Sequence, residues 1–209
     1  MGITGFGKWT AVALSLVAAC TPVADLVSQN DTPDATPGTR VVTVSGQDVI
    51  VGDAAGYCIN DRQSRDTSNG AFVVMGPCDT DAEVRTARGL VLVNVLADAE
   101  MTRAVRDETL EGFFKSAAGR RALSAHGDGG QVRILGTMEN NAAFYVHSLD
   151  EAGPVIPDTS PEQWRAFLVA GDRLVSISVV NFTDAPMSDG MIFTQLETIA
   201  RAIRRLNRG

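Results

Sequence analysis

The first regular patterns in the chain are short runs of β-branched and aliphatic residues. The runs 41–44 and 49–51 are separated by Gly46-Gln47-Asp48, a turn signal, so we predict two strands joined by a turn. The run 90–96, with the sequence Leu-Val-Leu-Val-Asn-Val-Leu, is almost entirely apolar and has the length of one strand. Such a run is most simply a central strand of a sheet.

Residues 98–125 have a helical composition instead. Asp107 or Thr109 can open a first helix, and Ser116 can cap a second helix that ends near Leu123. The first helix would place four apolar residues on one face: Leu110, Phe113, Phe114 and Ala117. We expect the adjacent phenylalanines to pack in the core, and a ligand pocket around them is the alternative.

The last third of the chain predicts two consecutive hairpins. Its strand-like runs are 131–135, 142–147, 164–169 and 174–180. The first two flank Glu139-Asn140-Asn141 and the last two flank Gly171-Asp172, and both of these are turn signals. Consecutive hairpins of this kind form an antiparallel sheet.

A final helix follows, with Ser188 or Asp189 as its cap. Its apolar residues recur at spacings of four and three and form one stripe, which must lie on the sheet: Ile192, Leu196, Ile199, Ile203 and Leu206. The C-terminal end of this helix is rich in arginine, with Arg201, Arg204, Arg205 and Arg208. These charges suit the negative end of a helix, and contact with anionic lipid or a partner is the alternative interpretation.

The chain begins with the parts of an export signal. Lys8 gives a basic start, and the apolar run after it is shorter than the about twenty residues that span a bilayer. We therefore expect residues 1–19 to be removed. The sequence Val17-Ala18-Ala19-Cys20 resembles the bacterial lipobox, which implies lipidation of Cys20 and, with Thr21 in place of aspartate, an outer-membrane lipoprotein that faces the periplasm. An ordinary signal peptidase site, with Cys20 as a bystander, is the alternative.

The cysteine count agrees with lipidation. Three cysteines are an odd number that would leave a free thiol in an oxidising compartment. If Cys20 carries a lipid, Cys58 and Cys78 are left to pair, which stabilises the fold by about 3 kcal/mol in the chain-entropy model. Two buried thiols or a metal pair are the alternatives. A zinc site lacks ligands, because only His126 and His147 accompany the cysteines.

Composition and charge bound the domain organisation. Hydrophobic residues make up 44% of the chain and charged residues 21%, which is a globular composition. Residues 20–39 contain three prolines and many small polar residues, so we expect the lipidated cysteine and a flexible tether of about 20–30 Å. Residues 40–209 then form a single domain. Loss of residues 1–19 removes one lysine and no acidic residue, so the net charge falls from −7 to −8, which argues against nucleic acid as a partner.

Residues with candidate chemistry are few. The polar loop between Cys58 and Cys78 carries Arg62, Arg65 and Asp66, a candidate binding site with arginines for an acidic ligand group. A solvated hairpin or helical turn is the simpler alternative. The chain has no nucleophile elbow, zinc-protease motif or phosphate-binding glycine loop. We therefore expect no metal, no cofactor and no catalytic residue, with His126 exposed in a connector and His147 packed or exposed in a strand.

The element order of residues 40–207 resembles the PsbP-like αβα sandwich, whose members mostly bind partners or assist assembly. The cysteine-flanked block 56–78 and the ending 164–180 with its helix are also similar to uncharacterised exported proteins of alphaproteobacteria. We expect an α+β fold, with a mainly antiparallel sheet, helices packed on it and one disulfide.

The function we expect is that of a membrane-anchored cell-envelope lipoprotein with a non-catalytic binding or assembly domain. Its partners would be the membrane, through the lipid, and an envelope protein or a small ligand. The alternative is a periplasmic enzyme, such as a hydrolase, whose Asp, Arg or His residues converge only in three dimensions. In location, a soluble periplasmic protein is the alternative to an anchored one.

Overall fold

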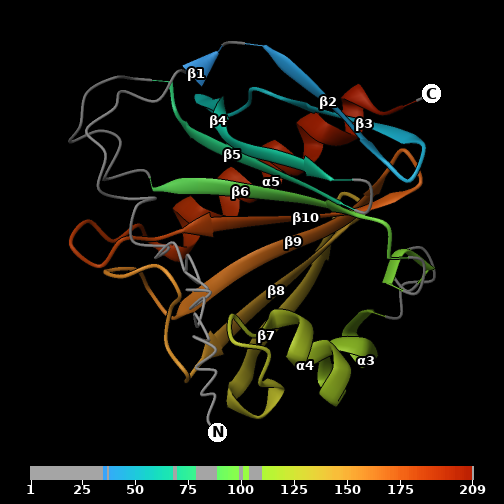
Figure 1. Cartoon of the computed structure of the whole chain (residues 1–209). Coiled ribbons are helices and arrows are strands. Elements are labelled where there is room, and N and C mark those ends of the chain that lie inside the picture. The colour runs from blue at the N-terminus through green and yellow to red at the C-terminus, as the bar shows by residue number, and fades with distance from the viewer. Residues whose placement is uncertain are drawn as a thin grey trace, which may run out of the picture. The chain divides into compact units, whose positions relative to one another are not determined.

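The computed structural model of the chain describes residues 35–36, 38–67, 70–78, 89–98, 101–103 and 110–208 (Figure 1). All of them belong to the second of two compact units, residues 32–209. The predicted signal segment 1–19, Cys20 and the candidate caps Asp107 and Thr109 lie outside the described residues.

Among the described residues, eight strands form one antiparallel sheet. In spatial order these strands are β1 (Ala35–Thr36), β4 (Tyr57–Thr67), β5 (Gly70–Pro77), β6 (Leu90–Leu96), β10 (Arg173–Val180), β9 (Glu162–Ala170), β8 (Ala143–Asp150) and β7 (Val132–Asn140). The hairpins predicted in the last third of the chain are β7–β8 and β9–β10, and both are confirmed. The run at 90–96 is β6, and it is central as expected, because it pairs with β5 and β10.

A separate hairpin consists of β2 (Thr39–Val44) and β3 (Gln47–Gly52), which confirms the first predicted strand pair. Four of its valines are fully buried in the larger core: Val42, Val44, Val49 and Val51. Asn207, just after the final helix, binds the hairpin through two hydrogen bonds to the backbone of β3. Its amide nitrogen donates to the oxygen of Ile50 and its amide oxygen accepts from the nitrogen of Ile50, both at 2.8 Å. The side chain thus pairs with β3 as a neighbouring strand would.

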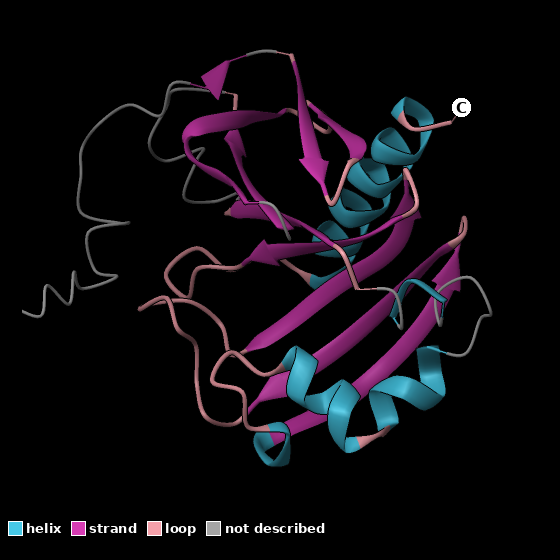
Figure 2. Cartoon of the chain, turned by 45° about the vertical axis from the view of Figure 1, so that its right-hand side comes forward, coloured by secondary structure: helices cyan, strands magenta, loops and turns pink. Residues whose placement is uncertain are grey.

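Helices cover both faces of the sheet (Figure 2). The helix α5 (Asp189–Leu206) packs against β9 and β10, whereas α3 (Leu110–Lys115) and α4 (Ala117–Leu123) pack against β7 on the opposite face. Ser188 is the cap of α5, one of the two predicted. Four members of the predicted stripe are buried, and Leu206 at the end of the helix is exposed.

The pleat of β8 shows how one strand supplies two cores. Tyr145 is fully buried in the larger core, on the α5 face, while Phe144 and Val146 lie in a smaller core under α3 and α4. Phe114 of α3 stacks on Phe144 with ring centroids 5.8 Å apart. Because successive side chains of a strand point to opposite faces, each strand in the middle of the sheet can be apolar on both sides.

The helices α3 and α4 meet at Ser116, which caps α4 as predicted and accepts a hydrogen bond from the nitrogen of Gly119 at 3.1 Å. Phe114 is fully buried and Phe113 is half-buried, so the core-packing interpretation holds for Phe114. Ala117 is exposed, contrary to prediction, because the chain turns at Ser116 and Ala117 begins a new helix with a different face.

The predicted disulfide between Cys58 and Cys78 is confirmed. Cys58 lies in β4 and Cys78 directly follows β5, so the bond joins two neighbouring antiparallel strands. The polar segment between the cysteines is part of a hairpin, which was the simpler of its two interpretations, and is not an irregular binding loop. Most of it continues β4, with a register shift between Asn60 and Arg65. The buried hydroxyl of Ser64 compensates for that shift, because it donates to the oxygen of Asn60 at 2.7 Å and accepts from the nitrogen of Val74 at 3.0 Å.

The fold is thus α+β, with an antiparallel sheet and helices on both faces. The short strand β1 pairs Ala35 and Thr36 with Asn60 and Ile59, so the last part of the segment predicted as tether, 20–39, contributes to the sheet. No helix among the described residues combines the length and the apolar composition needed to cross a bilayer.

Candidate functional site

The residues predicted to form a binding loop, Arg62, Arg65 and Asp66, lie on the exposed part of β4. Asp66 accepts a hydrogen bond from Arg40 of β2 at 3.0 Å, and Asp61 accepts another from the same guanidinium at 2.6 Å. This pair of carboxylates ties the β2–β3 hairpin to the sheet. Binding of an acidic ligand by Arg62 and Arg65 stays a prediction.

The charge of Arg40 is secured by these contacts. Partial burial acts to lower the pKa of Arg40, but the hydrogen bonds to Asp66 and Asp61, together with their negative charges, outweigh burial and raise it. Asp66 therefore has a structural role, and its role in binding stays a prediction.

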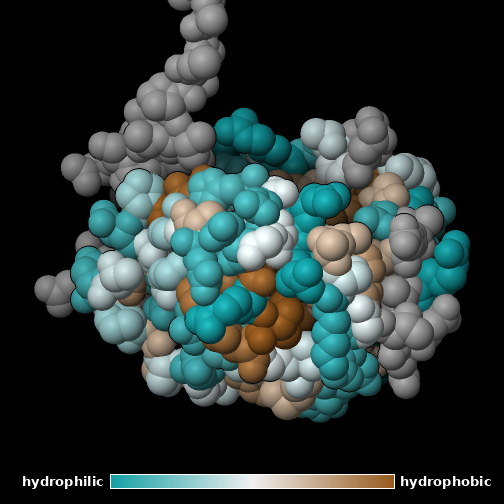
Figure 3. Space-filling view, turned by 90° about the horizontal axis from the view of Figure 1, so that it is seen from below, coloured by the Kyte–Doolittle hydropathy of each residue, from teal (hydrophilic) through white to brown (hydrophobic). Residues whose placement is uncertain are grey.

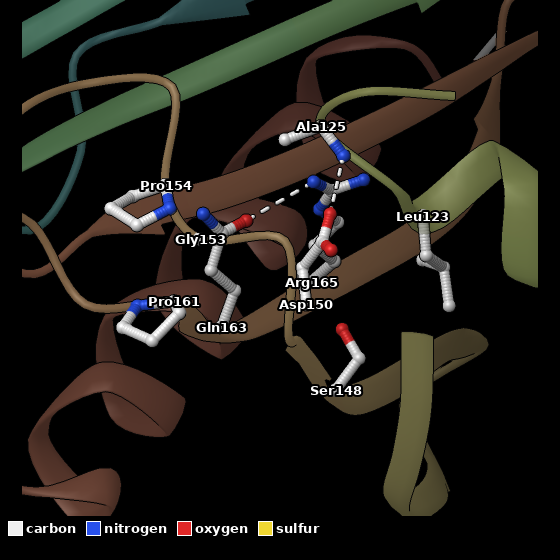
Figure 4. A pocket seen from close by; sticks show the side chains of 9 residues that line it. All are labelled: Leu123, Ala125, Ser148, Asp150, Gly153, Pro154, Pro161, Gln163 and Arg165. Carbon is white, nitrogen blue, oxygen red and sulfur yellow. Dashed lines mark hydrogen bonds between the residues drawn. The ribbon is translucent and has the colours of Figure 1, made fainter. Parts of the chain in front are cut away.

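A second polar cluster lies on the α4 face of the sheet, where Asp150 and Arg165 line a small hollow (Figure 4). Asp150 accepts hydrogen bonds from the nitrogen of Ala125 at 2.8 Å and from the hydroxyl of Ser124 at 3.1 Å. The space beside these groups measures about 10 Å³, which is enough for one water molecule. The cluster fastens the loop after α4 to the end of β8, and a substrate does not fit there.

Arg165 is held in this cluster by weak polar contacts. Its guanidinium donates to the oxygen of Gln163 at 3.1 Å and to the backbone oxygen of Ala122 at 3.4 Å. Burial lowers the pKa of Arg165, and the negative charge of Asp150 acts in the opposite direction. The negative charge of Asp150 thus acts on a guanidinium that is partly buried.

A larger hollow, of about 510 Å³, lies along the first half of α5 beside the loop before β4. Its lining consists of small, hydroxyl-bearing and uncharged residues: Ala55, Ser188, Gly190, Met191, Thr194, Gln195 and Thr198. None of these side chains ionises, so this hollow offers space without acid, base or charged groups. Of these two hollows, the larger one has space for a ligand but no ionisable side chain in its lining. The smaller one has ionisable side chains but no space for a ligand.

The third cluster is formed on the α5 face by His147 of β8, Glu162 and Trp164 of β9, and Asp189 of α5. His147 and Trp164 are directly opposite in the β8–β9 pairing, and the two rings stack with centroids 4.4 Å apart and planes 10° apart. Phe193, one turn after Asp189, contacts Trp164 edge-on at 5.9 Å. The imidazole is therefore held by an aromatic neighbour that is itself packed under α5.

His147 is hydrogen-bonded as well as stacked. Its Nε2 lies 2.6 Å from Oε1 of Glu162, and because a carboxylate only accepts, Nε2 carries the hydrogen. One ligand atom of each of His147, Glu162 and Asp189 lies within 4.8 Å of the others. Among the described residues, this cluster brings together an imidazole and two carboxylates at a partly exposed position. It is the candidate functional site.

Sequence reasoning found His147 but not its neighbours. We expected a packed or exposed histidine in a strand, and the structure places it in β8, mostly buried, with 13% of its side chain exposed. Glu162 and Asp189 gave no signal, because 15 and 42 positions separate them from His147 and no motif links the three. His126 is exposed in a connector, as predicted.

The outer strand β7 forms a second surface of interest beside this cluster. Leu135 and Met138 are 44% and 40% exposed, and Met138 stands opposite Tyr145 in the β7–β8 pairing. Figure 3 shows the molecule from below, the side on which β7, α3 and α4 lie in Figure 1, and an apolar area on that side is bordered by hydrophilic side chains. Among the described strands, β7 pairs only with β8 and is an edge of the sheet.

Comparison with known protein families, with curated proteins and with solved structures found no match to this chain. The function of the chain is therefore inferred from the clusters and surfaces described above.

Proposed function

We propose that this chain is a cell-envelope lipoprotein, exported and anchored through a lipid on Cys20, whose domain binds a protein partner and does no chemistry. The partner adds an extended segment to the free edge of β7. A small ligand is the second kind of occupant that such a domain accommodates, in the hollow along α5. Outer-membrane location facing the periplasm belongs to the same proposal.

The disulfide supports the export part of the proposal. Disulfides persist in oxidising compartments such as the periplasm and are rare in the cytosol. Cys58 and Cys78 pair with each other, so Cys20 is the remaining cysteine of the three in the chain. Lipidation would modify the thiol of Cys20. Cleavage at an ordinary signal peptidase site would leave that thiol free.

The exposed edge of β7 is the observation that carries the binding part. An edge strand presents unpaired backbone N–H and C=O groups, and extended peptides add to such edges through these groups, with side-chain pockets for specificity. Leu135 and Met138 supply apolar contacts along it. The register shift between Ile134 and Gly136 and the charges of Arg133 and Glu139 are features that discourage unselective pairing of edges. The strand is therefore suited to a selected partner.

The two hollows support a role without chemistry. A catalytic site brings ionisable groups to a space that holds the substrate. Here Asp150 and Arg165 border a space of about 10 Å³, and the hollow of about 510 Å³ has an uncharged lining.

Kinship with the PsbP-like αβα sandwich is the finer structural part of the proposal. Its support is the element order and the presence of α5 on one face of the sheet and α3 and α4 on the other. Binding and assembly roles are common in that fold, which agrees with the proposed activity.

Lipidation and location are tested by the intact mass of the protein extracted from membranes of the bacterium that produces it. We expect a mass that begins at Cys20 plus a lipid increment, with two thiols that appear only after reduction. An unlipidated mass would contradict the lipid anchor on Cys20. Thiols that react without reductant would contradict the pairing of Cys58 with Cys78.

The binding role is tested with a photo-crosslinking amino acid placed at Leu135 or Met138 in the full chain. The matched control is the same amino acid at Val41, which is 55% exposed on β2, away from the β7 edge. We expect a discrete protein adduct from the two β7 positions and none from Val41, and Leu135→Lys should abolish the adduct formed at Met138. Equal adducts at all three positions would refute a specific edge.

An enzyme, such as a hydrolase, is the alternative function, and one observation favours it. The 2.6 Å hydrogen bond from His147 to Glu162 is the arrangement in which a carboxylate orients an imidazole for general base catalysis. In that case envelope extracts would contain a substrate whose turnover is lost in His147→Gln and retained in His126→Gln. Turnover that survives His147→Gln would remove this alternative.

A further inference from the structure

His147, Glu162 and Asp189 come from three different elements, β8, β9 and the first turn of α5. Strand pairing places Glu162 on the same face as His147 and one diagonal step away, because His147 is opposite Trp164. Asp189 reaches the same point because α5 begins above this end of β9. The three side chains are thus brought together by tertiary structure and do not belong to one acidic stretch of the sequence.

The charges at this point favour a cation. Two carboxylates lie within 4.8 Å of each other and of the imidazole, so the cluster carries about two negative charges when the imidazole is neutral. The N-terminal end of α5 offsets about half an elementary charge. Among the described residues, no lysine or arginine forms an ion pair with Glu162 or Asp189. The remaining negative charge is uncompensated.

The imidazole is also held in position and reachable. Stacking on Trp164 fixes the plane of the His147 ring, as neighbours of metal ligands do in metal sites. Gly136 stands opposite His147 in β7, and the space where its Cβ would be is open. Glu162 is 45% exposed, and Asp189 is exposed. An ion can therefore reach the ligand atoms from solvent without any rearrangement of the core.

We propose that His147, Glu162 and Asp189 bind one divalent first-row transition-metal ion, with water in the remaining positions. The ion takes the place of the hydrogen on Nε2 of His147, that hydrogen is exchanged through solvent for one on Nδ1 so that the imidazole stays neutral, and the ion takes one oxygen from each carboxylate. Tetrahedral coordination at about 2.0–2.2 Å requires ligand atoms about 3.5 Å apart. His147 and Glu162 must separate from 2.6 Å, and small rotations of the exposed carboxylates are sufficient.

The ligand set also selects the class of ion. Imidazole with carboxylate suits Zn²⁺, Co²⁺, Ni²⁺ or Mn²⁺. Ca²⁺ and Mg²⁺ bind through oxygen ligands and in larger number, so they should compete poorly here. The proposed site does not depend on the envelope role proposed above, because none of its three proposed ligands is a cysteine.

Co²⁺ is the probe for the test, because it quenches tryptophan fluorescence at short range and its visible spectrum reports coordination number. The full chain is used in its oxidised form, with Trp9→Phe so that Trp164 is the only tryptophan, and with Cys20→Ala so that no thiol competes. We expect saturable quenching with one Co²⁺ per chain, reversed by Zn²⁺ and not by Mg²⁺.

Three variants assign the ligands and one controls for histidine in general. His147→Gln, Glu162→Gln and Asp189→Asn should each weaken Co²⁺ binding about tenfold or more. His126→Gln replaces the only other histidine and should bind as the parent does. Unchanged circular dichroism and thermal unfolding of the two carboxylate variants, both at exposed positions, separate loss of ligand from loss of fold.

Two outcomes would overturn the proposal. One is the absence of quenching and of a visible Co²⁺ spectrum at millimolar Co²⁺ in the correctly folded parent. The other is equal Co²⁺ affinity of the parent and His147→Gln, or equal weakening by His126→Gln, which would place the ion elsewhere.

Discussion

The indole of Trp164 lies flat against the imidazole of His147, with 4.4 Å between ring centroids. The two residues face each other across β8 and β9, so the stack follows directly from strand register. Aromatic pairs of this kind add about 0.5–1.5 kcal/mol beyond the area they bury. The imidazole of the candidate site is therefore fixed by the sheet, whereas the carboxylates of Glu162 and Asp189 are exposed.

Removal of the disulfide should weaken the domain without changing its fold. The bond closes a loop between positions 20 apart, so the double change Cys58→Ala, Cys78→Ala should lower the free energy of unfolding by about 3 kcal/mol. Urea titration with and without reductant measures this. Reductant should destabilise the parent and leave the double variant unchanged, and equal stability of the two oxidised proteins would contradict the prediction.

Gly119 should not tolerate a side chain. A Cβ there would lie 2.6 Å from Cα of Phe114 and would collide with the carbonyl oxygen of Phe113, so α4 would have to move away from α3. Gly119→Ala should therefore cost about 1–3 kcal/mol of stability, as overpacking does. Gly112→Ala in α3 is the matched control, because open space surrounds that position. If both variants unfold at the same urea concentration, that result would contradict the close contact between α3 and α4 at Gly119.

Asp150→Asn should destabilise the protein although it changes few atoms. The buried carboxylate accepts hydrogen bonds from Ala125 and Ser124, and its charge acts on the partly buried guanidinium of Arg165. We expect a loss of about 2 kcal/mol, typical of a buried charged group deprived of a partner. Asp184→Asn, at an exposed position, should change stability by less than about 0.5 kcal/mol. Equilibrium unfolding of both variants measures the two changes in stability, and equal changes would contradict the prediction.

Tyr145 gives the domain a sensitivity to alkaline pH. Burial raises the pKa of its phenol from 10.0 to about 12. Between these values the unfolded chain loses the proton while the folded chain keeps it, so the stabilising contribution present below pH 10 declines as the pH rises to about 12. The stability of the parent should therefore fall more steeply over this interval than that of Tyr145→Phe. Parallel curves would contradict the assigned pKa.

The same substitution should cost little at neutral pH. The hydroxyl of Tyr145 is buried without a hydrogen-bond partner among the described residues, so Tyr145→Phe removes an uncompensated polar group. We expect a change within about 1 kcal/mol at pH 7. Thermal unfolding of the two proteins measures it.

Local sequence signals were sufficient for most of the fold. Gly171 and Asp172 both have positive φ, which is why that dipeptide predicts a tight turn between β9 and β10. Ser116 and Ser188 cap helices with their hydroxyls, as short polar side chains before an apolar periodicity do. The pairing of Cys58 with Cys78 was predicted from the odd number of cysteines, with Cys20 set aside for the lipid. These features depend on residues that are close in the chain.

What could not be predicted depends on residues that are far apart. The polar sequence of segment 60–67 left a binding loop, a hairpin and a helical turn open, and pairing with β5 and the buried hydroxyl of Ser64 make it one strand of a hairpin. The cluster of His147, Glu162 and Asp189 requires the register of β8 on β9 and the docking of α5. No spacing along the chain encodes that register.

The pairing of Asn207 with Ile50 joins residues 157 positions apart. Until synthesis has passed Asn207, the β2–β3 hairpin lacks its fastening to α5 and the larger core stays open on that side. Contacts of such long sequence separation form late and slow the overall rate of folding. The larger core therefore stays accessible to solvent until α5 and Asn207 have docked on the β2–β3 hairpin.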